Sequence, residues 1–467
     1  MGRKITIDPI TRIEGHARVE IDVDDNNKVT SSVFQVLDFR GWETFLRGMQ
    51  VENMATITPR ICGTCPQTHH LASARTLDRV FDVQIPRPAE LLRYAANMGG
   101  LVHSHAVHFF ALAAPDLVMG VDAKPETRNI VGLVQAMPDL ATKALRLRSV
   151  GHKIVELIGG RGTHPVSCVA GGLSTPLGKD KRDVFSRLAN EGLTLSRELF
   201  DVGKKALFAD RALAESLPIE THYMGTSKDG ALDLYQGALR FVSADGDAFE
   251  FSEDRYTDHI VEFVGASTYA KHTRFRKDPN GDSVPYRVGP LARLNTCDFI
   301  DTPLAQKEFE EFRVVAGFPS HETMFYHYAR LIELLHAVEK LAELAKDDEI
   351  YSDNVRTKKL NAPRSATAHV EAPRGTLIHD YDVDENGIVK KANLLVATQQ
   401  NIPAINETIS MSAEKFINQS DGFLLNAIEM GIRCYDPCLS CATHRYGEMK
   451  LDVIVRKEGH ELRRARR

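Results

Sequence analysis

The sequence lacks any long apolar run and has few cysteines for its length. No uninterrupted apolar stretch approaches the ~18 residues that a membrane-spanning helix requires, and the first residues have no apolar core of the kind found in signal peptides. The seven cysteines in 467 residues are too few and too unevenly placed for a disulfide scaffold. We therefore expect no membrane span, no export signal of the chain's own and no disulfide framework.

A strong excess of charge of one sign is also missing. The 58 lysines and arginines nearly balance the 63 aspartates and glutamates, which leaves a formal net charge of -5. The local exception is a group of arginines at the end of the chain, at positions 463, 464, 466 and 467. No sequence-wide field therefore favours nucleic acid or an anionic membrane. Hydrophobic residues make up 43% of the chain, which is enough for a sizeable core.

Apolar periodicity predicts an α+β fold with a large, mainly helical core and peripheral β-hairpins. Helical spacing runs through residues 88–118 and 321–343, and a shorter helical face over 424–432 stops at Asp436-Pro437. A further helix is predicted over 71–81. Alternating apolar residues on either side of a turn predict hairpins over 19–36, 241–251 and 376–398.

Four of the cysteines form two Cys-x-x-Cys pairs, Cys62 with Cys65 and Cys438 with Cys441. A two-residue gap lets both sulfurs of a pair bind one metal, and four thiolates suit zinc, iron, nickel or an iron-sulfur cluster. The pairs lie near opposite ends of the chain, whereas those of a zinc ribbon lie about 15 to 20 residues apart. Closing so long a loop costs only ~2.5 to 3 kcal/mol more than closing a short one, so a structural zinc site stays open. The separation predicts a site that the completed fold assembles, which suits a catalytic centre.

The residues around both pairs extend these signatures. Residues 59–70 read PRICGTCPQTHH and residues 436–444 read DPCLSCATH. They resemble the R-x-C-G-x-C-x-x-x-H and D-P-C-x-x-C-x-x-H motifs of nickel-iron hydrogenase large subunits. The resemblance covers essentially the whole chain and looks closest to the soluble methyl-viologen-reducing, heterodisulfide-reductase-associated type. The NAD(P)-linked bidirectional type is also similar. Other matching stretches are residues 11–16, 40–43, 105–110 and 371–375.

The resemblance implies a Ni-Fe centre that splits H2 into protons and electrons. It implies that Cys62, Cys65, Cys438 and Cys441 hold nickel, and that Cys65 and Cys441 bridge to an iron carrying carbon monoxide and cyanide. Thiolates stabilise an electron-poor metal, and a terminal thiolate such as Cys438 can accept a proton when H2 splits heterolytically. Glu14 is the expected proton relay. Without the resemblance, Glu14 would be interpreted as a strand-turn carboxylate that pairs with Arg12 or Arg18.

Further roles follow from the resemblance alone. Arg374 is expected over the open face of the two metals, held by Asp116 and Asp436, since a buried guanidinium needs such partners. As isolated residues, the two aspartates would be read as a helix end and a turn residue. Thr398 and the backbone after Pro373 are the expected donors to the cyanides, with Ala397 standing where many relatives have proline. A Mg2+ site is expected at Glu43, His444 and the main-chain carbonyl near Leu394.

The remaining histidines and cysteines are expected to be structural. We interpret them as core or supporting residues, with His69 hydrogen-bonding a thiolate and the three other cysteines acting as small apolar side chains. The histidines are His69, His70, His103, His105 and His108, and the cysteines are Cys168, Cys297 and Cys434.

Partners and processing complete the expectations. With its paired cysteines used at one site, the chain has no second cluster for iron-sulfur centres, so electrons must leave through an iron-sulfur small subunit. Further electron-transfer subunits, of a heterodisulfide reductase or a flavin module, and a cytoplasmic location are implied by the resemblance. A maturation endopeptidase is expected to cut between His444 and Arg445, which leaves residues 1–444 as a single catalytic domain. The alternative for 445–467 is a permanent edge strand.

Two other classes of protein remain as rivals. A zinc-stabilised scaffold would contain zinc and no nickel. A structural or quinone-module subunit of the complex I kind is related in fold, but such relatives lack the four thiolates.

Overall fold

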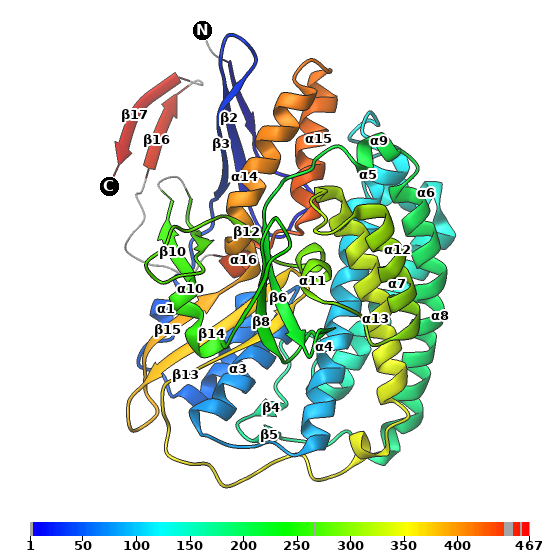
Figure 1. Ribbon diagram of the computed structural model, residues 1–467, viewed down its shortest axis with the longest axis vertical. Coiled ribbons are helices and arrows are strands. Elements are labelled where there is room, and N and C mark those ends of the chain that lie inside the picture. Colours follow the sequence, from blue (N-terminus) through cyan, green and yellow to red (C-terminus); the bar gives the residue numbers. More distant parts are fainter. Residues whose placement is uncertain (1–2, 266–267, 443–451, 458–459, 467) are drawn as a thin grey trace.

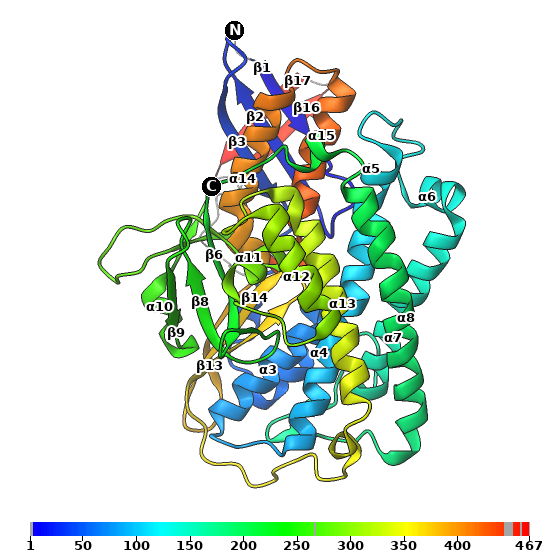
Figure 2. The same cartoon turned by 45° about the vertical axis from the view of Figure 1, so that its right-hand side comes forward.

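The computed structural model describes residues 3–265, 268–442, 452–457 and 460–466, with side chains described as far as residue 442. Long helices gather along one side of the molecule and small sheets along the other (Figures 1 and 2). The main hydrophobic core includes buried residues from Ile5 to Ala442, so both ends of this span contribute to one core. The predicted α+β class is confirmed.

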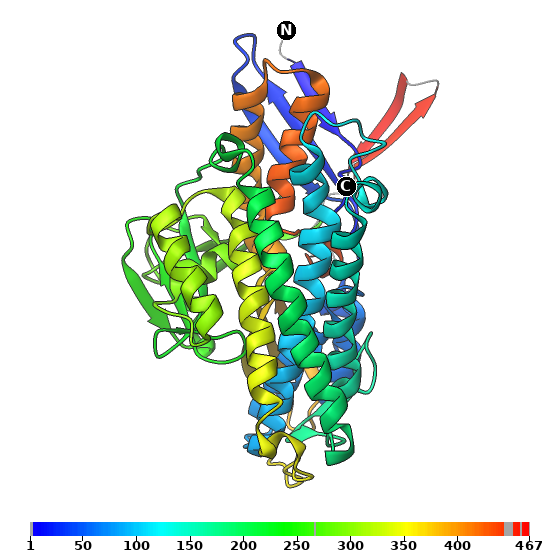
Figure 3. The ribbon, with the colours of Figure 1, turned by 90° about the vertical axis from the view of Figure 1, so that its right-hand side faces the viewer.

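Four long helices run side by side along the long axis (Figure 3). Helix α4 packs against α7 and α13, and α8 packs against the same two helices. Helix α13 is almost wholly buried, which explains its apolar character on all sides. The helix predicted over 321–343 is confirmed, although its first turn is a 3-10 turn, Thr323–Phe325. The bounds are α4 (Arg87–Val107), α7 (Pro138–Gly159), α8 (Arg182–Leu207) and α13 (Tyr326–Leu344).

The helical pattern over 88–118 is not one α-helix. Helix α4 is followed by a π-helical segment, η3 (His108–Ala113), and by the short helix α5 (Ala114–Met119). Pro115 has no N–H, and in a continuous α-helix its ring would collide with the carbonyl of Ala111. The wider turn avoids this collision and places Asp116 in the first, buried turn of α5.

All three predicted hairpins are present. They are β2 (Ala17–Val23) with β3 (Val29–Val36), β8 (Ala238–Val242) with β9 (Ala248–Phe251), and β14 (Gly375–Val383) with β15 (Val389–Leu395). Strand β1 (Arg3–Ile7) adds to the first pair, β6 (His222–Lys228) to the second and β13 (Ala366–Ala372) to the third. The last hairpin was predicted to reach residue 398, but its second strand ends at Leu395. Helix α14 (Ala397–Phe416) begins two residues later.

The elements around the cysteine pairs explain how distant segments meet. A 3-10 turn, η2 (Thr58–Ile61), precedes Cys62, and helix α3 (Pro66–Val80) begins directly after Cys65. Helix α3 packs on β13 and β14. Helix α15 (Asp421–Cys434) ends before Asp436, and the short helix α16 (Leu439–Ala442) follows Cys438. The predicted positions, one pair before a helix and one after, are confirmed.

Near the chain end, β16 (Asp452–Lys457) pairs antiparallel with β17 (His460–Arg466). The strand character expected for this extension is therefore present over both segments. Among the described residues, none of the helices combines the length and apolar character needed to cross a bilayer.

Candidate metal centre

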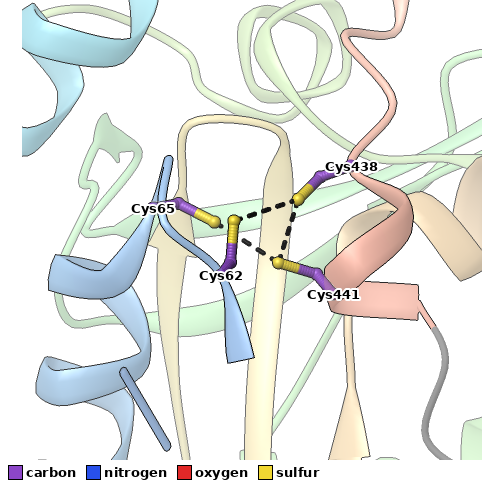
Figure 4. A group of neighbouring side chains, drawn as sticks. All are labelled: Cys62, Cys65, Cys438 and Cys441. Atoms are coloured by element: carbon purple, nitrogen blue, oxygen red, sulfur yellow. Dashed lines mark hydrogen bonds between the residues drawn. The ribbon is translucent and has the colours of Figure 1, made fainter. Parts of the chain in front are cut away.

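The four paired cysteines converge on one point between helices α3 and α16 (Figure 4). Their Sγ atoms all lie within 4.8 Å of one another. The shortest separations are 3.1 Å for Cys438–Cys441, 3.3 Å for Cys62–Cys438 and 3.4 Å for Cys65–Cys441. A disulfide would need about 2.05 Å, whereas four sulfurs around one metal at about 2.3 Å stand about 3.8 Å apart. The cysteines are buried and free, and their spacing fits a metal ion.

The electrostatics of the cluster favour a cation at its centre. Hydrogen bonding with Cys438 lowers the pKa of Cys62 well below its usual value and lowers the pKa of Cys65 to about 7. Burial raises the pKa of Cys438 and of Cys441. The four thiols therefore cannot all ionise in this buried space without a compensating positive charge. Soft sulfur donors select metals such as nickel, iron or zinc to supply it.

Arg374 lies in the turn between β13 and β14, beside the sulfurs. Gly375, which follows it, has φ +136°, and a Cβ there would come within 2.5 Å of Val288 Cγ2 and 2.7 Å of Gly289 N. Only glycine permits this close approach, which fixes the turn that carries Arg374. The close packing around Gly375 therefore explains why the matching stretch 371–375 ends in glycine.

The Arg374 guanidinium is held by Asp436 and faces the thiols. Its Nε donates to the Asp436 carbonyl at 2.6 Å, and an Nη donates to Asp436 Oδ1 at 3.1 Å. Burial opposes its charge, but Asp436 and the neighbouring cysteines outweigh this and raise its pKa. Its Nη1 and Asp436 Oδ2 find no hydrogen-bond partner among the described residues. A buried donor without a partner indicates that the site takes an acceptor from a bound group.

The predicted contact between Asp116 and Arg374 is wrong. Asp116 is instead held by Arg12, by Arg128 at 3.2 Å and by Arg433 at 2.9 Å. Both of its carboxylate oxygens are engaged by these guanidinium groups, which leaves it no role toward Arg374. Asp116 therefore ties α5 to α15 and to the segment after β1.

Glu14 reaches the cluster from the N-terminal segment. Its Oε2 lies 3.1 Å from Cys438 Sγ and accepts from Ser440 N at 3.0 Å, and its Oε1 accepts from Ser440 Oγ. Gly15, with φ +84°, allows this approach, since a Cβ would stand 2.8 Å from Leu439 Cβ. The side chain is partly exposed, so it connects a buried sulfur with the outside.

The alternative pairing of Glu14 with Arg12 or Arg18 is wrong. Within the described part of the chain, Arg12 bonds to Leu112 O and Asp116, and Arg18 donates to Gln35 Oε1 at 2.6 Å. The arginines are already engaged, so the carboxylate of Glu14 is directed at Cys438.

A small cavity of about 20 Å³ adjoins the sulfurs. This space is sufficient for about one water-sized group. Thr398 Oγ1 accepts from Cys438 N at 2.9 Å, which leaves its O–H free to donate elsewhere. Three of the cysteines line the cavity together with the residues predicted beside the iron. The lining includes Cys65, Cys438, Cys441, Pro373, Arg374, Ala397 and Thr398.

Glu43 lies in helix α1 (Trp42–Phe45) and is buried beside a lysine. Its Oε1 accepts from Lys271 Nζ at 2.7 Å and from Leu394 N at 3.0 Å. Lys271 Nζ also lies 2.7 Å from Glu262 Oε1. The sequence offered no motif that marked Lys271, because it lies far from every matching stretch. His444 lies outside the described residues.

The histidine after the first pair contacts a thiol as predicted. His69 Nε2 lies 3.4 Å from Cys441 Sγ, and its Nδ1 lies 3.2 Å from His379 Nε2. Sequence reasoning missed His379, although its place in a predicted strand, two residues from Tyr381, would put both on one face. His70, His105 and His108 bond to backbone groups or Glu333, and His103 is only partly buried. The other cysteines are buried as predicted: Cys168, Cys297 and Cys434.

Comparisons with known proteins agree with this geometry. A family model described as nickel-dependent hydrogenase matches residues 40–142 and 250–444, and one described as HoxL-like matches residues 4–39. The chain is 41% identical over 460 residues to one subunit of the F420-non-reducing hydrogenase vhc from Methanococcus voltae, covering 95% of this chain and 96% of that protein. It is 37% identical over 479 residues to the NAD-reducing hydrogenase HoxS subunit beta of Cupriavidus necator, with 97% of each covered. A solved NAD+-reducing NiFe hydrogenase in the H2-reduced state has a TM-score of 0.90 at 34% identity, covering 95% of this chain and 99% of that chain.

Proposed function

The chain belongs to the nickel-dependent hydrogenase family, and we propose that it is the catalytic large subunit that splits H2 reversibly into two protons and two electrons. The observation that carries this proposal is the cluster of four buried thiols from opposite ends of the chain, all within 4.8 Å. Four thiolates give the chain a site for a soft metal, and the family specifies nickel.

We propose that nickel binds all four cysteines and that Cys65 and Cys441 also hold an iron with carbon monoxide and cyanide. The lining residues support this position for the iron, because Cys65 and Cys441 face the same space as Arg374 and Thr398. When bound, the centre supplies an electron-poor metal that polarises H2 and takes its electrons. The Nη1 of Arg374 and the hydroxyl of Thr398 are the donors that cyanide nitrogens need. Pro373 and Ala397 line the same space with apolar groups.

Heterolytic cleavage also requires a base and an exit for the proton. Cys438 Sγ accepts the proton, and Glu14 Oε2, at 3.1 Å, takes it onward. The N–H and O–H of Ser440 hold the Glu14 carboxylate toward the sulfur. Since Glu14 is partly exposed, the relay leads from a buried thiol toward solvent. Asp436 keeps Arg374 charged and oriented beside the site.

A magnesium ion at Glu43, the Leu394 carbonyl and His444 remains part of the proposal. The Glu43 carboxylate and the neighbouring Glu262 supply the hard oxygen atoms that Mg2+ prefers. Lys271 contacts both carboxylates, so a bound Mg2+ would share them with an ammonium group.

Electrons must leave through a partner. The cluster of Cys62, Cys65, Cys438 and Cys441 is the single group of candidate metal ligands found in the described part of the chain. We therefore propose an iron-sulfur small subunit, with further electron-transfer subunits that lead to ferredoxin or heterodisulfide-type acceptors. The similarity to an NAD-reducing hydrogenase keeps a flavin-containing, NAD(P)-linked complex as the second candidate. The cytoplasmic location stays a prediction.

Elemental analysis and infrared spectroscopy of the anaerobically purified native complex test the proposal. We expect nickel and iron near one each in this subunit, with carbonyl and cyanide bands. Zinc without such bands in fully matured protein would establish the scaffold alternative. The four cysteines of the cluster count against a complex I-like subunit, because such relatives lack these thiolates.

We also propose that the chain is cut between His444 and Arg445, which leaves a single catalytic domain, 1–444. This position lies outside the described residues, and the β16–β17 hairpin lies beyond it. The full chain has a mass of 52.0 kDa. Mass spectrometry of the active subunit is expected to show loss of residues 445–467. A full-length mass in active enzyme would instead support the permanent-strand alternative.

A further inference from the structure

Helix α15 ends in a left-handed turn that carries Asp436. Asp436 has φ +51°, a conformation that few residues other than glycine adopt and that persists only where the surroundings hold it. The turn closes through the N–H of Asp436, which donates to Arg433 O at 3.0 Å. Both side-chain hydrogen bonds that Arg374 makes within the described part of the chain end on Asp436, one on its carbonyl and one on its carboxylate. The geometry of this turn therefore decides where the Arg374 guanidinium lies.

His108, the first residue of η3, contacts both sides of the turn. Its Nε2 lies 2.7 Å from Arg433 O. A carbonyl oxygen can only accept, so His108 Nε2 carries the proton and donates. The same nitrogen lies 3.9 Å from Asp436 Oδ1. The imidazole is buried and stacks on His327, with ring centroids 5.7 Å apart. One ring thus contacts the carbonyl that closes the turn and the carboxylate that the turn presents.

Arg330 on α13 supports the next carbonyl. Its Nη2 donates to Cys434 O at 3.0 Å. The last carbonyls of a helix have no α-helical partner and need donors from elsewhere. Two consecutive carbonyls at the end of α15 therefore accept from buried side chains of two other elements, η3 and α13.

A space-filling role alone does not explain a histidine at position 108. Burial, with Arg330 and His327 nearby, lowers the pKa of His108 well below its usual value, so the ring is neutral. Its Nδ1 is then a bare acceptor, and this atom has no hydrogen-bond partner among the described residues. An apolar side chain would avoid leaving such an acceptor buried. What distinguishes histidine here is the donor at Nε2.

We infer that His108 is a positioning residue, which holds the turn at Asp436 and so directs Arg374 at the metal centre. The inference rests on the proposed nickel-iron centre, in which Arg374 Nη1 donates to a cyanide. No group changes its protonation. Without the imidazole, the Arg433 carbonyl loses a donor and the Asp436 carboxylate loses the neighbour that limits its rotation. Arg374 follows, because its hydrogen bonds end on Asp436.

Substitutions at position 108 separate the donor from the volume of the side chain. His108→Leu keeps apolar volume and removes the donor, and the amide nitrogen of His108→Asn is too close to the main chain to reach Arg433 O. Both are expected to lower H2-dependent dye reduction by about tenfold, the effect of one buried hydrogen bond. His108→Gln places an amide N–H near the position of Nε2 and is expected to restore activity. The matched control is His336→Leu, which removes a fully buried histidine that bonds to Thr302 at 2.9 Å.

Infrared spectra of the anaerobic holoenzyme complex give the decisive measurement. His108→Leu and His108→Asn are expected to shift the cyanide bands, whereas His108→Gln and His336→Leu keep them near the wild-type positions. Arg374→Met removes the donor itself, so adding His108→Leu to it is expected to cause no further shift.

Two results would overturn this inference alone. One is wild-type cyanide bands in both His108→Leu and His108→Asn. The other is an equal shift from His108→Leu with and without Arg374→Met, because His108 would then act by another route. A shift in His336→Leu of the same size would also count against it, since the loss of any buried histidine would then move the bands. A wild-type complex without carbonyl and cyanide bands would overturn the proposed function and the inference with it.

Discussion

A Cys65→Ser variant is expected to lose bound nickel and to lower H2 oxidation by about 10² to 10³-fold. Serine removes one of four soft donors and puts a harder, more basic oxygen in a buried position. A four-thiolate site contributes about 10 to 16 kcal/mol of binding, so one ligand accounts for about 2.5 to 4 kcal/mol, or about 10² to 10³ in affinity. Metal analysis and H2-dependent dye reduction of the purified complex measure both losses.

Cys297→Ala is the matched control for this loss. Cys297 is also a buried free thiol, but burial raises its pKa and it belongs to no group of candidate ligands among the described residues. Its removal is expected to cost stability through a small cavity and to leave nickel content unchanged. A Cys65→Ser protein that keeps one nickel and full activity would contradict the four-cysteine site.

Local pattern was sufficient for several elements of this fold, but the long helices α7, α8 and α14 were not predicted. Alternation around Asp24–Asn27, Asp245-Gly246 and Asn386-Gly387 predicted three hairpins, because strand periodicity and turn chemistry are both local. The error over 88–118 was also local in origin: Pro115 lies within an apolar helical pattern, and periodicity alone does not report that it forces a π turn.

Site residues that lie in a sequence motif were predictable. Contacts that depend on tertiary packing were not. The cysteines and Glu14 lie in matching stretches, and the structure brings them together. The partner of Asp116 was predicted wrongly, because three arginines from separate elements compete for one carboxylate. His379 and Lys271 were missed, since their importance comes from which residues the sheet places beside them.

A Glu14→Gln variant is expected to keep its nickel and iron and to lose H2 oxidation by about 10² to 10⁴-fold, the range for removal of a general acid-base group. Glutamine has nearly the same shape and can still accept from Ser440, but its amide cannot take a proton from Cys438. Metal content, infrared bands and H2-dependent dye reduction are measured together, which separates a lost relay from a lost centre.

Two further variants serve as comparisons for Glu14→Gln. Ser440→Ala removes one donor to Glu14 and leaves the carboxylate, so we expect a loss of no more than about tenfold, in line with ~1 kcal/mol for a hydrogen bond. Glu20→Gln changes a carboxylate on β2 that pairs with Lys4 at 2.9 Å, away from the sulfurs, and is expected to be silent. Activity of Glu14→Gln within twofold of wild type would mean that the proton leaves Cys438 by another route, since no other carboxylate of the described residues is bonded to that sulfur.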